Sequence, residues 1–154
     1  MSVLNFVLAG IALYANNFFA NQRERRKETR SKLDEIIKQI ESIQALAIDY
    51  HTGNSYSETK RDTLIISLSR LQTSIGRVVF FRQDTILVGK VVKFKQAISS
   101  RNFENAEFHS QSHNSEIVLD MLNSKESLHS QLESAYESVF PVEVNSTLAK
   151  FLGR

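Results

Sequence analysis

The sequence predicts an all-α protein, in which an N-terminal single transmembrane helix continues into a cytoplasmic antiparallel four-helix bundle. Three observations lead to this prediction. Residues 3–20 are almost entirely apolar, a strongly basic run follows at residues 23–32, and the remaining chain repeats apolar residues in alternating steps of three and four. Such steps are typical of packed helices. One Pro and five Gly in 154 residues leave few helix breakers, and the lack of Cys excludes disulfides and thiolate chemistry.

Residues 1–22 are predicted to be the transmembrane anchor. The apolar stretch is 18 residues long, close to the lower limit of about 17 for crossing a bilayer. A peripheral amphipathic helix or a buried core helix are the alternatives. Because the basic residues follow the apolar stretch, the positive-inside rule places the N-terminus outside and the body in the cytoplasm, at the cell (inner) membrane.

Residues 23–32 form a basic juxtamembrane collar. Residues 1–32 carry six basic and two acidic side chains, a net charge of +4, whereas residues 33–154 carry 13 basic and 15 acidic ones. A localised positive charge suits anionic membrane lipids better than it suits nucleic acid. The residues expected to contact lipid headgroups are Arg23, Arg25, Arg26, Lys27 and Arg30.

A narrow polar stripe runs along the predicted span. At about 100° per residue, Asn5, Ala9, Ala12 and Asn16 fall on one side of the helix. Small residues and amides favour contact between helices in a membrane. We therefore expect a homo-oligomer, with a pore lined by the amides as its most specific form. The alternative is a lone anchor whose asparagines lie in the two headgroup regions.

The predicted bundle covers residues 33–141. Its first helix continues the anchor to about Tyr50, and a turn at residues 51–54 uses Gly53 with positive φ. A capping box, Ser55 with Glu58, opens a second helix that extends to residue 82. The apolar seam of the first predicted bundle helix consists of Leu33, Ile36, Ile40, Ile43, Ala47 and Tyr50.

Two further helices complete the predicted bundle. Asp84 caps the third, and the fourth extends over residues 116–140 until Pro141 stops it. Residues 142–154 then form a short amphipathic tail. The seam of the third helix is Leu87, Val91, Phe94 and Ile98.

A short polar segment between the last two helices contains Arg101, Asn102 and His109. It resembles the motif of HEPN domains, helical bundles that include many ribonucleases, although seven residues separate the Arg from the His here. The resemblance implies that His109 acts as general acid/base and that Arg101 holds a phosphate. The alternative is an exposed loop arginine with an unrelated histidine. In overall plan the chain is also similar to single-pass accessory proteins of RNA-targeting CRISPR systems, which implies a membrane oligomer or pore in phage defence.

His109 and His113 are four residues apart, a spacing that can bind zinc on one helix, with Glu116 and Asp120 following. Chance pairing of two of the four histidines is the alternative, and no cofactor is otherwise expected. The sequence names no reaction. It predicts a membrane-anchored, self-associating helical protein that forms a pore or perturbs the membrane. The alternatives are an adaptor for a cytoplasmic protein partner and a HEPN-like ribonuclease.

Overall fold

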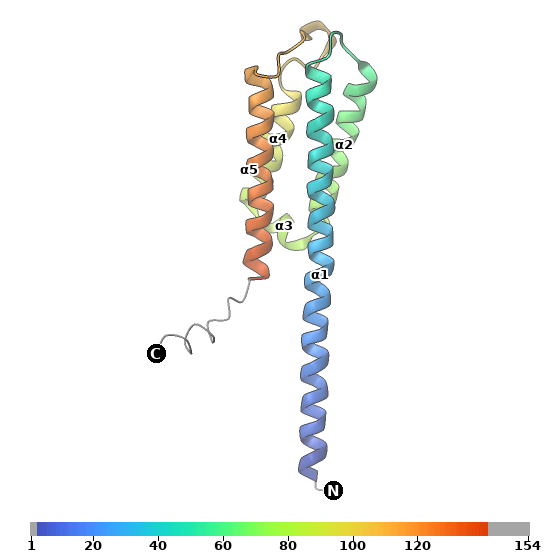
Figure 1. Cartoon of the computed structure of the whole chain (residues 1–154), viewed down its shortest axis with the longest axis vertical. Helices are drawn as coiled ribbons and strands as arrows, with labels where there is room; N and C mark the ends of the chain where they lie inside the picture. Colours follow the sequence, from blue (N-terminus) through green and yellow to red (C-terminus); the bar gives the residue numbers. More distant parts are fainter. Residues whose placement is uncertain (1–2, 142–154) are drawn as a thin grey trace, which may run out of the picture. The chain divides into compact units, whose positions relative to one another are not determined.

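A computed structural model describes the backbone of residues 3–141 and the side chains of residues 13–141 (Figure 1). No strand occurs in this described part of the chain, so the all-α prediction is confirmed. Its elements are α1 (Val3–His51), α2 (Glu58–Gly76), α3 (Val79–Gln83), α4 (Thr85–Ser99), the 3₁₀ turn η1 (Asn105–Glu107) and α5 (Glu116–Val139). The contacts within the chain divide it into two units, residues 1–34 and residues 35–154.

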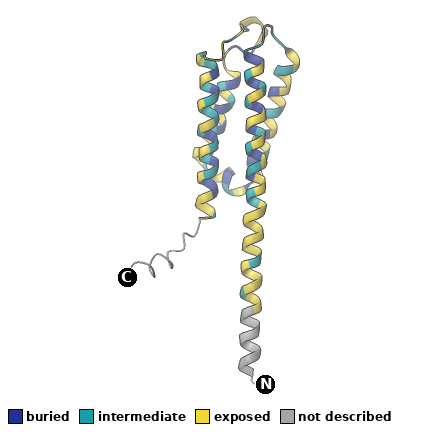
Figure 2. Ribbon diagram, viewed as in Figure 1, coloured by how far each residue is buried: buried dark blue, intermediate teal, exposed yellow. Residues whose placement is uncertain are grey.

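The second unit is a helical bundle. The part of α1 that follows residue 34 lies beside α2, α4 and α5 (Figure 1). Short connections precede α2, α3 and α4, whereas the longer segment 100–115, which contains η1, joins α4 to α5. Buried residues follow the inward-facing side of each helix, as Figure 2 shows. The predicted seam of α1 is buried in full, as is that of α4. Alternating steps of three and four therefore identified the core-facing side of these helices correctly.

Two helix boundaries differ from the prediction. Ser57, and not Ser55, caps α2, since its side chain accepts a hydrogen bond from the Lys60 backbone N–H at 3.4 Å. The second predicted helix is also broken, because Val78 is extended with φ −91° and ψ 110°. Residues 79–83 then form the separate helix α3, whose Phe81 is fully buried. Insertion of this ring into the core accounts for the break.

The cap predicted at Asp84 is present, whereas the turn at Gly53 requires glycine for a different reason from the one predicted. The Asp84 carboxylate accepts from the backbone N–H groups of Ile86 and Leu87 and caps α4. None of the glycines whose conformation is described has positive φ. A Cβ on Gly53 would lie 3.3 Å from the carbonyl oxygens of Asp49 and Tyr50, so the turn requires glycine for close approach and not for φ.

The first unit corrects the central sequence prediction. Within the described part of the chain, no helix has an apolar stretch long enough to cross a membrane. The predicted transmembrane anchor at residues 1–22, and with it the single-pass inner-membrane topology, is therefore wrong. The physical reason is polarity: Asn16 and Asn17 interrupt the apolar stretch, and charged residues begin at Arg23, whereas a span needs about 20 predominantly apolar residues.

Two predictions fall on residues that the structure does not describe. The side chains of Asn5, Ala9 and Ala12, three of the four in the predicted stripe, lie outside the described residues, while Asn16 is exposed on α1. The amphipathic tail predicted at residues 142–154 also lies outside them.

Candidate functional site

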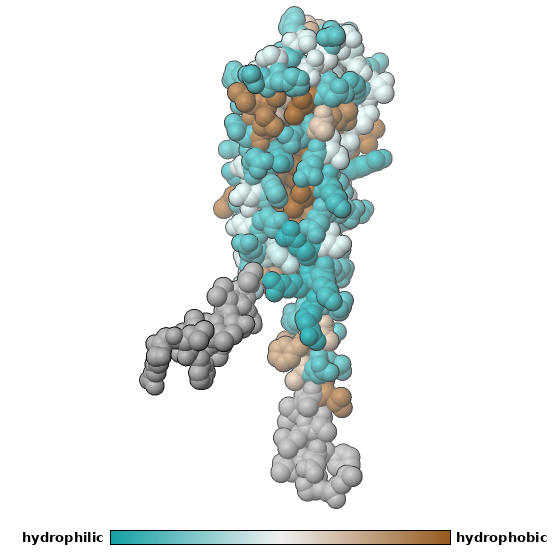
Figure 3. All heavy atoms as spheres, viewed as in Figure 1, coloured by the Kyte–Doolittle hydropathy of each residue, from teal (hydrophilic) through white to brown (hydrophobic). Residues whose placement is uncertain are grey.

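Residues 13–32 of α1, here called the uncovered segment, form a continuous helix in which no side chain is buried (Figure 2). Four large apolar side chains are nevertheless present, and their exposed fractions are 66% for Leu13, 75% for Tyr14, 49% for Phe18 and 62% for Phe19. On the face drawn in Figure 3, apolar surface of α1 adjoins a hydrophilic stretch of the same helix. Exposed apolar surface gathered in this way marks an interaction site more often than scattered single residues do.

The charged residues of the uncovered segment pair mainly along the helix itself. Lys27 contacts Glu24 at 3.3 Å, and Lys32 contacts Glu28 at 2.7 Å. The Lys32 ammonium lowers the pKa of Glu28, through its hydrogen bond first and its charge second. Such exposed pairs contribute little to stability and are easily exchanged for other partners. Arg30 likewise contacts Asp34 at 2.9 Å. The contact of the basic collar with lipid headgroups stays a prediction.

A second candidate lies where the loop before α5 meets the end of α1. His51 is fully buried, and its Nε2 lies 2.9 Å from the carbonyl oxygen of Ile98. The side chain of Asn102 lies between His51 and the backbone of His109, at 3.3 Å from His51 Nδ1 and 2.6 Å from the His109 N–H. Asn102 itself is 7% exposed and has φ 54°, in the left-handed region. Asparagine is one of the few residues besides glycine that tolerates this conformation.

Only one assignment of donors and acceptors fits all the hydrogen bonds of this network. The His109 N–H can only donate, so Asn102 turns its oxygen to it and its amide nitrogen to His51. His51 Nδ1 must then accept, which leaves the ring proton on Nε2, where it is donated to Ile98. His51 is therefore neutral, and burial lowers its pKa, with a smaller opposing effect from the Ile98 hydrogen bond.

Aromatic rings surround this network. The ring of Tyr50 makes contacts with Tyr56, Phe103 and Phe108 at centroid distances of 6.4, 5.6 and 5.4 Å. Its hydroxyl donates to the carbonyl oxygen of Phe103 at 2.6 Å. Burial, followed by the nearby Tyr56 and Glu104, raises the pKa of Tyr50 to about 12. A phenol held in this way closes the end of the bundle and is poorly suited to proton transfer near neutral pH.

The residues of the HEPN-like motif lie in two different environments: Arg101 is on the surface beside α5, and Asn102 is in the buried network. The Arg101 guanidinium forms ion pairs with Glu116, at 3.3 Å, and with Asp120. Asn102 faces inward and ties His51 to the backbone of His109, while the His109 side chain is exposed. Asn102 and His109 therefore meet through a main-chain contact, and each residue has a local structural role. Catalysis by Arg101 and His109 stays a prediction.

The histidine pair also lies in a different setting from the one predicted. His109 and His113 are in the irregular loop before α5 and not on one helix, so their four-residue spacing does not put them one helical turn apart. Among the described residues, no group of three or more His, Asp or Glu side chains is arranged to hold a metal ion.

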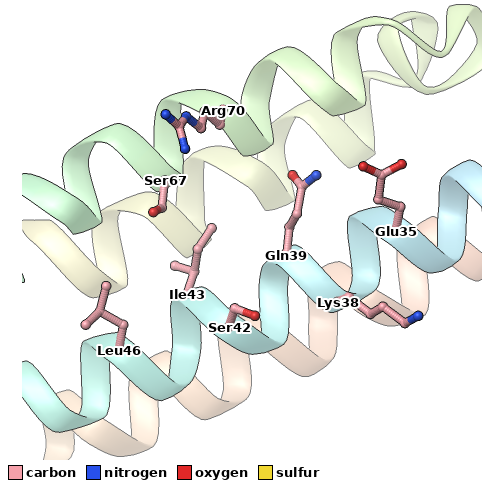
Figure 4. A pocket seen from close by; sticks show the side chains of 8 residues that line it. All are labelled: Glu35, Lys38, Gln39, Ser42, Ile43, Leu46, Ser67 and Arg70. Carbon is pink, nitrogen blue, oxygen red and sulfur yellow. The ribbon is translucent and has the colours of Figure 1, made fainter.

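A shallow groove lies between α1 and α2 within the second unit (Figure 4). Its volume is about 430 Å³. Gln39 points between the two helices, and its Oε1 is buried without a hydrogen-bond partner in the described structure. The lining residues are Glu35, Lys38, Gln39, Ser42, Ile43, Leu46, Ser67 and Arg70. They include no histidine and no carboxylate pair, so the groove offers surface for binding and no acid–base chemistry.

Comparison with protein-family models, with curated proteins and with solved structures gives no match. The candidate sites thus depend on geometry alone. From the sequence, residues 1–32 were predicted to contact lipid, and the burial of His51 and of the Gln39 side-chain oxygen was not predicted. Gln39 had a weak local signal, because it directly precedes Ile40 in the seam. His51 had none, since its partner Asn102 is 51 positions away.

Proposed function

We propose that this protein is a self-associating helical interaction module, whose copies join through the uncovered segment, residues 13–32. The observation that carries the proposal is a helix of 20 residues with no buried side chain and with exposed Leu13, Tyr14, Phe18 and Phe19. In water, most helical stability comes from packing one face against a partner, because nucleation is unfavourable and propagation adds little. A second helix over this segment would supply that packing.

Charge and chemistry favour a binding role over a catalytic one. The strongest local polar network, around His51 and Asn102, is closed by hydrogen bonds and rings and leaves no group free to react. The uncovered segment exposes aromatic rings and arginines, side chains that are enriched at recognition surfaces. Attachment of a different protein to the same segment, the adaptor alternative, stays a prediction.

The test is the mass of the purified full-length protein in solution. Light scattering and sedimentation should give a dimer or larger species for the wild type. The double substitution Tyr14→Ser with Phe18→Ser should raise the dissociation constant at least about tenfold, because burying one aromatic side chain contributes about 1.5–3 kcal/mol. A matched control is Ile65→Ser with Ile66→Ser, two exposed apolar residues of α2.

The control variant should keep the wild-type mass, since it removes apolar surface from the bundle and leaves the uncovered segment intact. A wild-type protein that stays monomeric at all concentrations tested would overturn the proposal. A monomer that co-sediments with vesicles of anionic lipid would overturn it too, and would assign the same surface to lipid.

A further inference from the structure

We infer that two copies of the uncovered segment pair antiparallel, with the two-fold axis beside Arg23. This inference rests on the proposed function and specifies its geometry. Its basis is one stripe of exposed residues that recurs along the segment in steps of four and three, the spacing of a coiled-coil seam. The stripe consists of Tyr14, Phe18, Asn21, Arg25, Glu28 and Lys32, and every member is exposed.

This stripe differs from the others along the segment because it contains two aromatic rings. Tyr14 and Phe18 are one helical turn apart and therefore lie on the same side of α1. Phe19 lies about 100° away from Phe18 and belongs to a different side. The stripe is also asymmetric, with its rings at one end and its charges, Arg25 to Lys32, at the other.

A parallel, in-register pair is unfavourable for this stripe. Each residue would then face its own copy, so Arg25, Glu28 and Lys32 would form three successive layers of like charge. Like charges at facing seam positions repel, and the net charge of +4 carried by residues 23–32 of each copy would add to the repulsion.

An antiparallel pair replaces all three like-charge layers with mixed ones. With the axis beside Arg23, Lys32 lies opposite Tyr14 of the second copy, where an ammonium over a phenol ring is attracted by a cation–π interaction. Arg25 lies opposite Asn21, whose amide oxygen accepts from a guanidinium. Phe18 lies opposite Glu28, whose methylene groups pack on the ring while its carboxylate keeps the contact with Lys32 that the single chain already makes.

The test uses single cysteines, which is straightforward because the natural chain contains none. Asn17→Cys and Ser31→Cys flank the stripe and leave its six residues unchanged. These positions are about 21 Å apart along one helix, from 14 residues at 1.5 Å each. In the antiparallel pair, two copies of Asn17→Cys are offset by about 18 Å along the axis and two copies of Ser31→Cys by about 24 Å, whereas Asn17→Cys and Ser31→Cys are offset by only about 3 Å. A bismaleimide shorter than about 18 Å should therefore link Asn17→Cys to Ser31→Cys when the two variants are mixed, and neither variant to itself.

Linking of Asn17→Cys to its own copies, with none between the two variants, would overturn the antiparallel geometry while leaving self-association intact. Absence of any linked species, together with a monomeric mass by light scattering, would instead overturn the proposed function. A second measurement uses neighbouring rings: Phe18→Ser should weaken association at least tenfold, whereas Phe19→Ser should change it less than threefold. Equal weakening by both would also contradict the stripe.

Discussion

The two halves of α1 contrast sharply in what surrounds them. Residues 33–50 carry a seam that is fully buried in the bundle, while residues 13–32 carry aromatic side chains and bury none of them. Both halves are equally helical. The comparison teaches that helix formation and helix packing are separate properties: local propensity and few breakers produce the rod, but apolar residues at regular steps on one face decide which half forms a core.

The largest expected difference between the halves is in amide hydrogen exchange. At a dilution where the protein is monomeric, residues 36–50 should exchange only on global unfolding, which costs about 5–15 kcal/mol in typical domains. Residues 13–32 should exchange through local opening that costs close to zero. Raising the protein concentration should slow exchange in the second group alone. Equal protection of both halves in a dilute monomer would remove the contrast.

The next contrast compares one residue from each half. Ile40→Ala empties a site in the core and should lower the free energy of unfolding by about 2–5 kcal/mol, because Ile40 is 1% exposed. Phe19→Ala removes a larger side chain from an exposed site and should change it by less than about 0.5 kcal/mol. Urea unfolding of the monomer measures both. A cost for Phe19→Ala similar to that for Ile40→Ala would show that the uncovered segment is packed after all.

The hydrogen-bond network at the C-terminal end of α1 provides a third test, at Asn102. Asn102→Ala should lower the free energy of unfolding by about 2–4 kcal/mol, since it removes the acceptor of the His109 N–H and the donor to His51 Nδ1 and forces alanine into the left-handed region. Asn102→Gly loses the same hydrogen bonds but tolerates φ 54°, so it should cost about 1 kcal/mol less. Equal costs for the two variants would mean that the backbone conformation adds nothing.

Particular residues show which features the sequence could predict and which it could not. The seam of α1 and the cap at Asp84 were predictable because they depend on neighbours within one or two turns. The break at Val78 was not, because the apolar spacing of α2 continues through it and a tertiary contact of Phe81 interrupts the helix. The pairing of His51 with Asn102 joins the end of α1 to a loop 51 positions away, so no local sequence pattern predicts it. The apolar stretch at residues 3–20 was misjudged, since its hydrophobicity outweighed its asparagines in the prediction.

A smaller effect is expected from the protonation of His51. Burial lowers its pKa below the ordinary value of 6.5, so the unfolded chain binds a proton more readily than the folded one. The stability gained from neutral His51 is complete above pH 6.5 and should be lost as the pH falls from there toward the folded pKa. Unfolding free energies between pH 7.5 and pH 5 measure this loss, and carboxylates with lowered pKa, such as Asp84, act only below this window.

The variant that tests this account is His51→Gln, which removes the buried ring at the end of α1. It should abolish the loss of stability between pH 7.5 and pH 5, although it is less stable than the wild type at every pH. A wild-type stability that is constant over this window would contradict the neutral, buried state deduced from the hydrogen bonds of Asn102.

The smallest expected effect concerns Arg101, whose ion pairs with Glu116 and Asp120 lie on the surface. Arg101→Ala should lower the free energy of unfolding by at most about 1 kcal/mol, and added salt should reduce that loss, because exposed pairs are screened. The same variant decides the HEPN-like prediction. If wild-type protein cleaves RNA, then Arg101→Ala and His109→Ala must both abolish cleavage while unfolding stays nearly unchanged. Cleavage that survives in either variant would leave Arg101 with only its surface ion pairs.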